Sequence, residues 1–252
     1  MASNGEAIDT SSHTDAALWK WAQLTLGSEF TVDDIDASYV RVHPGTLYYE
    51  GTRDWYRTTI QEPEVYNNDG DEPMSSFYER SFRFTSNARW RLTKPLDSRI
   101  LPTCPLTLEF PGNENNKELI SVTFDDVNAE DVEKTIEIPH SSAIYKTLTV
   151  NPYTTVEAGV GIKSCLLDEV PFKVDIIYSG SLIARGHRIK RARAKSEVKV
   201  GVATALRDVT GFKPIDGLPR QEVKVSYTLE GVCSGECLVS VMPRFAELQS
   251  LV

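Results

Sequence analysis

The sequence predicts a mostly-β protein in which an elongated lobe of long antiparallel strands follows a smaller, aromatic-rich N-terminal lobe with one short helix. Apolar and polar residues alternate with a period of two over many segments, which is typical of strands with one buried face. Turn-forming pairs such as Asn151-Pro152 and Ser179-Gly180 separate these segments. Only one segment after the first few residues has a convincing helical pattern.

That helix is predicted close to the N-terminus. Thr14 or Asp15 can cap its first turn, and Gly27 can end it because glycine readily adopts the left-handed conformation of a helix stop. The residues that share one apolar face are Leu18, Trp21, Ala22, Thr25 and Leu26.

Strands are predicted for most of the chain that follows, and several exceed the usual five or six residues. They cover residues 81–92, 106–110, 120–124, 145–150, 156–166, 172–183 and 192–203, with further alternation at 223–229 and 238–241. Residues 125–134 are the one other segment with a helical pattern, and they are few.

The composition divides the chain into two predicted domains. All four tryptophans and most tyrosines lie within residues 1–90, which are also acidic, whereas Val, Thr, Ile, Ser and Lys dominate residues 91–252. We therefore expect an N-terminal aromatic lobe with a boundary near Trp90.

The charge and hydropathy narrow the class of partner. The 252 residues carry a formal net charge of −9, which argues against nucleic acid as a partner because phosphate binding needs a basic surface. No run of 18 apolar residues and no conventional signal peptide is present. We expect a protein that is secreted without a classical signal peptide, or is cytoplasmic until it is released.

No catalytic pattern is recognisable. The four histidines are dispersed, no pair of cysteines has metal-site spacing, and phosphate-loop, nucleophile-elbow and dinucleotide motifs are absent from the sequence. The prediction is a protein that is not an enzyme and holds no metal or cofactor.

Two cysteines flank a possible turn. Alternating residues precede Cys233 and follow Cys237, so the intervening Ser-Gly-Glu is interpreted as a tight hairpin loop. Cysteines on either side of such a loop can face each other at a distance that a disulfide bridges. The alternative is a pair of reduced, half-buried thiols.

A basic stripe is predicted on one strand, where charges alternate with small or apolar residues. The stripe includes Arg188, Lys190, Arg191, Arg193 and Lys195. It can pair with the acidic run at 125–133, contact a neighbouring protomer or touch anionic lipid headgroups. It can also simply be a charged face that discourages edge pairing.

Two motifs resemble those of the aerolysin-type β-pore-forming proteins, whose relatives include epsilon toxin, the mosquitocidal toxins and natterin-like proteins. The first is TLTVNPYTTV at 147–156, and the second is EVPFKVD at 169–175. The family pattern has two prolines where Val150–Thr154 has one, and small residues where Lys173 and Val174 stand. The resemblance covers roughly residues 82–242, including the closing VSYTLEGV.

The resemblance implies an aerolysin-like β lobe at 91–252 that oligomerises on a membrane and inserts a hairpin at 103–124. Alternation is consistent with such a hairpin, because a pore strand faces lipid and lumen in turn. Its apolar face would be Leu106, Leu108, Phe110, Ile120, Val122 and Phe124. The alternative is an ordinary surface hairpin of a β-sandwich.

The N-terminal lobe would then recognise the target, a membrane lipid or a glycan receptor. Exposed aromatic rings stack on sugars and lie well at membrane interfaces. The residues expected to do so are Tyr48, Tyr49, Trp55 and Tyr56. Two other hypotheses remain open, namely a carbohydrate-binding module without pore activity and an assembly protein whose basic strand contacts a partner.

Overall fold

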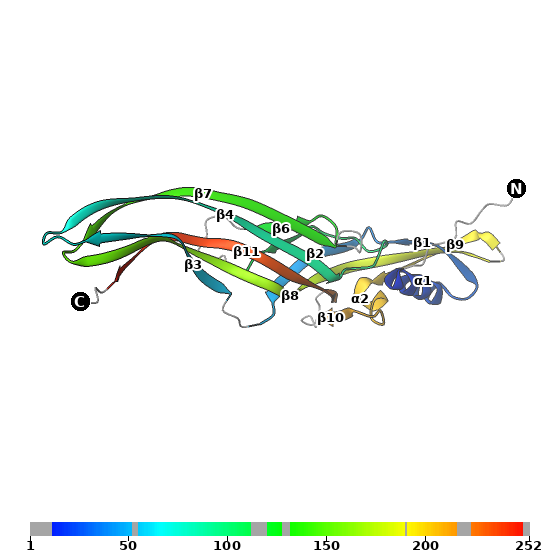
Figure 1. The fold of residues 1–252 in the computed structure, drawn as a ribbon. Coiled ribbons are helices and arrows are strands. Elements are labelled where there is room, and N and C mark those ends of the chain that lie inside the picture. The colour runs from blue at the N-terminus through cyan, green and yellow to red at the C-terminus, as the bar shows by residue number, and fades with distance from the viewer. Residues whose placement is uncertain are drawn as a thin grey trace.

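A computed structural model describes residues 12–51, 55–111, 120–127, 132–189, 191–215 and 223–248. The molecule is elongated, with α1, β1 and β9 at one end and the ends of β3, β4, β7 and β11 at the other (Figure 1). The predicted mostly-β class, with long antiparallel strands and a helix near the N-terminus, is confirmed.

The helices and strands follow in chain order. Strands β4, β7, β8 and β11 are longer than the sequence alone predicted, whereas β5, β6 and β9 are slightly shorter. They are α1 (His13–Leu26), β1 (Phe30–Asp36), β2 (Val40–Tyr49), β3 (Tyr56–Asn68), β4 (Met74–Lys94), β5 (Leu106–Glu109), β6 (Ser121–Phe124), β7 (Glu133–Val150), β8 (Thr154–Arg188), β9 (Arg191–Gly201), α2 (Val202–Ala205), β10 (Phe212–Ile215) and β11 (Lys224–Leu248).

Strand β8 is the central strand of the molecule, and five other strands in the described part of the chain pair with it. Its 35 residues extend about 115 Å at the ordinary rise per residue. Along this length it pairs with β3 and β11, then with β2 and β11, and finally with β1 and β9. The turn predicted at Ser179-Gly180 is wrong, because Gly180 has φ 94° inside β8 and the strand continues through it.

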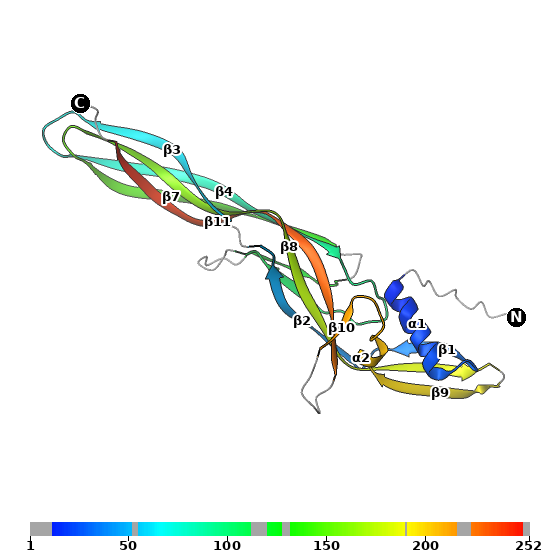
Figure 2. The ribbon, with the colours of Figure 1, turned by 90° about the horizontal axis from the view of Figure 1, so that it is seen from below.

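The sheet divides near Asn87 and Glu236 into two layers, which lie apart in the view of Figure 1 and overlap in that of Figure 2. Strand β4 pairs with β11 from Asn87 to Lys94. The pairing of β4 with β7 and that of β11 with β8 continue past this division, where β4 and β11 are no longer paired with each other. Apolar side chains from both layers meet between them and form a second core. They are Tyr78, Phe82, Leu148, Val150, Val156, Ala158, Val160 and Ile162.

The hairpin predicted between Cys233 and Cys237 is wrong, since β11 runs through both residues. Gly235 instead forms a bulge with φ 139°, a conformation that favours glycine. A Cβ atom at this position would lie 2.2 Å from the carbonyl oxygen of Asn87. Alternation interrupted by Ser-Gly-Glu is therefore the pattern of a bulged strand here.

The helix α1 is fastened to the chain segment that leads into β5. Its cap is Ser12, which accepts a hydrogen bond from the Asp15 backbone, so the cap lies before the predicted Thr14 or Asp15. The buried Asp15 carboxylate accepts hydrogen bonds from the Ser98 hydroxyl at 2.6 Å and the Arg99 amide at 2.9 Å.

The division into domains at residue 90 stays a prediction. Trp90 lies inside β4, and strands from both sides of this position belong to one sheet. Residues 125–134, which had a helical pattern, include the start of β7, and residues 128–131 lie outside the described part of the chain.

Replacing Asp15 tests the attachment of α1. We expect Asp15→Ala to lower the free energy of unfolding by about 2–3 kcal/mol, because it leaves the buried Ser98 hydroxyl and two backbone amides without their acceptor. Urea titration followed by tryptophan fluorescence measures this change. The control Asp71→Ala, at an exposed position, should change the value by less than about 0.5 kcal/mol. Equal effects of both variants would contradict the attachment.

Candidate functional site

The predicted insertion segment contains a hairpin that forms a small sheet of its own. Strands β5 and β6 pair with each other antiparallel, and they join no other strand among the described residues. Of the six predicted apolar residues, Val122 is half-buried. The other five are buried, namely Leu106, Leu108, Phe110, Ile120 and Phe124. The connecting residues 112–119 lie outside the described part of the chain.

The opposite face of this hairpin is polar. Thr107 and Thr123 lie opposite each other, both exposed, with their hydroxyl oxygens 3.0 Å apart. Glu109 is exposed as well. The hairpin is therefore amphipathic, with its apolar face on the core of the molecule.

Tyr49 ties the hairpin to the main sheet. Its hydroxyl donates a hydrogen bond to the Glu109 carbonyl at 2.7 Å and accepts one from the Trp90 indole nitrogen at 2.9 Å. The Trp90 ring also meets Phe110 edge-on, with centroids 6.1 Å apart. Burial raises the pKa of Tyr49, so its proton stays in place at neutral pH. Tyr49, predicted as a target-binding residue, thus contacts the hairpin.

The other predicted aromatic residues differ in exposure. Tyr48 is 63% exposed, whereas Tyr56 is 38% exposed and has the Lys163 ammonium over its ring. Trp55 is half-buried and packs against the main core. Of the four, Tyr48 therefore presents the most ring surface to solvent.

The basic stripe is partly neutralised by acids of the same chain. Arg188 forms an ion pair with Glu29 at 3.0 Å, and Lys195 is exposed. Lys190, together with the side chains of Arg191 and Arg193, lies outside the described part of the structure.

Arg185, a basic residue of β8 close to the stripe, shows which strands supply the acidic partners. Arg185 pairs with Asp34 and Asp36 of β1 and with Glu197 of β9, at 2.8 to 3.1 Å. Hydrogen bonds from Ser38 and from Arg185 lower the pKa of Asp36 to about 2. Strands β1 and β9, and not the run at 125–133, supply these partners.

The cysteines are free thiols, and all four are buried. Cys233 and Cys237 follow each other along β11, and the residue directly opposite Cys237 is Cys165 of β8. Burial raises the pKa of Cys165 to about 11 and that of Cys237 to about 12. The predicted possibility of a disulfide between Cys233 and Cys237 is therefore wrong, since it required two strands.

No helix within the described residues has the length and apolar character needed to cross a membrane. The same residues contain no group of three or more His, Cys, Asp or Glu side chains arranged to hold a metal ion.

The sequence matches no family model and no curated protein. Among solved structures, a non-toxic crystal protein from Bacillus thuringiensis is similar over 92% of this chain and 95% of that chain, with 13% identity and a TM-score of 0.63. One chain of the Cry23Aa1 and Cry37Aa1 binary protein complex is similar over the same shares of both chains, with 15% identity and a TM-score of 0.60. The Mpp75Aa1.1 beta-pore-forming protein from Brevibacillus laterosporus is similar over 88% of this chain and 79% of that chain, with 13% identity and a TM-score of only 0.43. The chain thus shares its fold with the first two over 92% of its length.

The state of the thiols can be tested directly. Because their pKa values are raised, Cys165 and Cys237 are neutral at pH 8, and we expect iodoacetamide to label them slowly in the folded protein. In urea all four cysteines should be labelled, as counted by intact mass. The assignment of four free thiols would be contradicted by an unreduced sample whose intact mass is lower by two hydrogens and in which Cys233 and Cys237 stay unlabelled in urea.

Proposed function

We propose that this protein binds a target membrane, oligomerises there and inserts the hairpin at 103–124 as part of a β-barrel pore. The observation that carries the proposal is the separate β5–β6 hairpin, with one apolar face buried on the core and one polar face exposed. The elongated fold with long antiparallel strands agrees with the resemblance to aerolysin-type proteins.

The same alternation would serve the soluble and the inserted state. In the folded chain the apolar face packs against the core, and in a barrel it would face lipid. Thr107, Glu109 and Thr123 face solvent now and would line a water-filled lumen. Because a barrel pairs every strand, the backbone groups of the inserted hairpin would all be hydrogen-bonded.

Insertion would require longer strands than β5 and β6. A membrane-spanning strand takes about nine to eleven residues, whereas β5 and β6 have four residues each. Residues 103–105 and the segment around Pro111 would therefore have to join the strands. The link from Tyr49 to Glu109 would have to break in the same step.

Other surfaces would serve target binding and assembly. Lys195 and its basic neighbours on β9 are suited to anionic headgroups or a neighbouring protomer. The exposed Tyr48 is suited to the target. This tyrosine also favours a second candidate function, a carbohydrate-binding module without pore activity.

Tethering the hairpin tests insertion. The Pro111 carbonyl oxygen lies 3.5 Å from the Cys165 thiol, so Pro111→Cys places a second thiol at the end of the hairpin, close to β8. We expect the oxidised variant, with the cross-link verified by mass spectrometry, to lose most dye release from red-cell ghosts. Dithiothreitol should restore it.

The matched control combines Pro111→Cys with Cys165→Ser, which cannot form this cross-link. It should release dye equally before and after oxidation. Dye release that persists with the cross-link intact would rule out insertion of this hairpin. Absence of release by the unmodified chain from ghosts and from liposomes, with no detergent-resistant oligomer, would count against the pore itself.

A further inference from the structure

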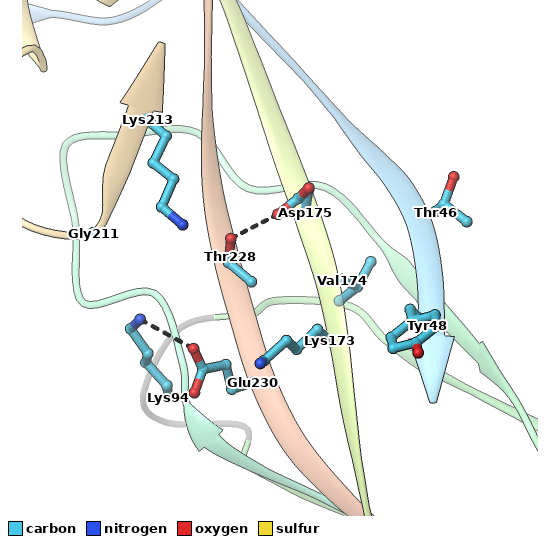
Figure 3. Close-up of a pocket in the computed structure, with 10 residues that line it drawn as sticks. All are labelled: Thr46, Tyr48, Lys94, Lys173, Val174, Asp175, Gly211, Lys213, Thr228 and Glu230. Atoms are coloured by element: carbon cyan, nitrogen blue, oxygen red, sulfur yellow. Dashed lines mark hydrogen bonds and ion pairs between the residues drawn. The ribbon is translucent and has the colours of Figure 1, made fainter. Parts of the chain in front are cut away.

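A groove that the pore proposal does not use lies on the outer face of the β2–β8–β11 sheet, with a volume of about 340 Å³ (Figure 3). This is the lower end of the usual range for ligand pockets, so a small polar ligand would fill it. Its lining residues are Thr46, Tyr48, Lys94, Lys173, Val174, Asp175, Gly211, Lys213, Thr228 and Glu230.

One row of side chains crosses four strands of this face. In the strand register, Lys173 of β8 lies opposite Tyr48 of β2 and Glu230 of β11, and Glu230 lies opposite Lys94 of β4. Side chains opposite each other on one face are close neighbours. The exposed tyrosine ring therefore lies at one end of a charged row.

A second row beside it carries hydroxyl groups and a carboxylate. Thr228 lies opposite Asp175 and donates a hydrogen bond to its carboxylate at 2.7 Å. On the other side, β2 has a bulge at 44–47, and such bulges re-aim side chains next to binding sites. Gly45 permits this, because a Cβ atom there would lie 3.0 Å from the Asp175 carbonyl oxygen. The bulge places Thr46 in the groove lining.

The charges of the groove leave one cation free. Lys94 pairs with Glu230 at 3.4 Å, and Lys173 pairs with Glu50 at 2.5 Å. Lys213 forms no ion pair with any residue that the structure describes, and its ammonium group points into the groove (Figure 3). A ligand with a negative group would therefore find an unpaired partner there.

We infer that this groove binds an acidic sugar, a saccharide ring that carries a carboxylate. The ring would stack on Tyr48, its hydroxyls would hydrogen-bond to Asp175, Thr46 and Thr228, and its carboxylate would pair with Lys213. As the target chemistry of the proposed pore former, this inference rests on the proposed function. It requires no membrane for its own test.

A sugar fits this face better than a choline headgroup does. Quaternary ammonium ligands are held by cages of several aromatic rings, whereas Tyr48 is the one ring that lines the groove within the described residues. The neighbouring Tyr227 ring already has the Lys94 ammonium over it, 5.8 Å from its centroid. Hydroxyl and carboxylate groups, which suit a polyhydroxyl ligand, make up the rest of the second row.

Calorimetric titration of the purified full chain with sialyllactose and with its methyl ester, without any membrane, tests the inference. We expect saturable binding of sialyllactose and about tenfold weaker binding of the ester, in which the same sugar rings carry no carboxylate charge. Lys213→Gln should remove this difference, and Tyr48→Ala should weaken binding of both sugars by about tenfold or more. Both positions are exposed, so the fold should be retained, as thermal unfolding can verify.

The matched control is Lys146→Gln, which removes the same charge from an exposed position of β7 and should bind as the unmodified chain does. Equal binding of both sugars, unchanged binding by Lys213→Gln or Tyr48→Ala, or no saturable binding would overturn the inference. Binding of phosphocholine but not of sialyllactose would do so too. Loss of dye release with sugar binding intact would count against the pore alone.

Discussion

The continuous hydrogen-bonding ladder of β8 is the constraint on which the rest of the structure depends. A single strand of 35 residues has too many backbone donors and acceptors to leave unpaired, so partners must be found along its whole length. Three successive pairs of strands supply them. This arrangement makes the molecule long and narrow. It separates the end that contains α1, β1 and β9 from the two-layered end.

The pairing of β8 also determines where the candidate functional surfaces form. The groove arises where β2 and β11 flank β8, because the register aligns Tyr48, Lys173 and Glu230 in one row. The bulge in β2 then adds Thr46 to the lining. The hairpin, in contrast, is outside the main sheet and is held by apolar packing and a few polar links such as that from Tyr49. The proposed insertion, in which this segment would leave the core, would therefore break no strand pairing of β8.

Two glycines in long strands show that a turn-like sequence can continue as a strand when neighbouring strands pair with it. Cys233 and Cys237 flank a sequence that is typical of a hairpin loop, yet the strand continues because β4 and β8 pair with it from both sides. Gly235 absorbs the irregularity as a bulge. The same logic holds at Gly180, where a positive φ accompanies a change of partner strand and not a chain reversal.

The sequence by itself determined the mostly-β class, the helix near the N-terminus and the amphipathic β5–β6 hairpin, because alternation and periodicity are local properties of the chain. It did not predict β1, β2 and β3, because each contains a register shift that interrupts the period of two. Only the tertiary structure decided that Tyr49 contacts the hairpin, that β1 neutralises Arg185 and that residues from β2, β4, β8, β10 and β11 line one groove. These outcomes depend on strand order and register, which are set by pairing between residues far apart in the chain.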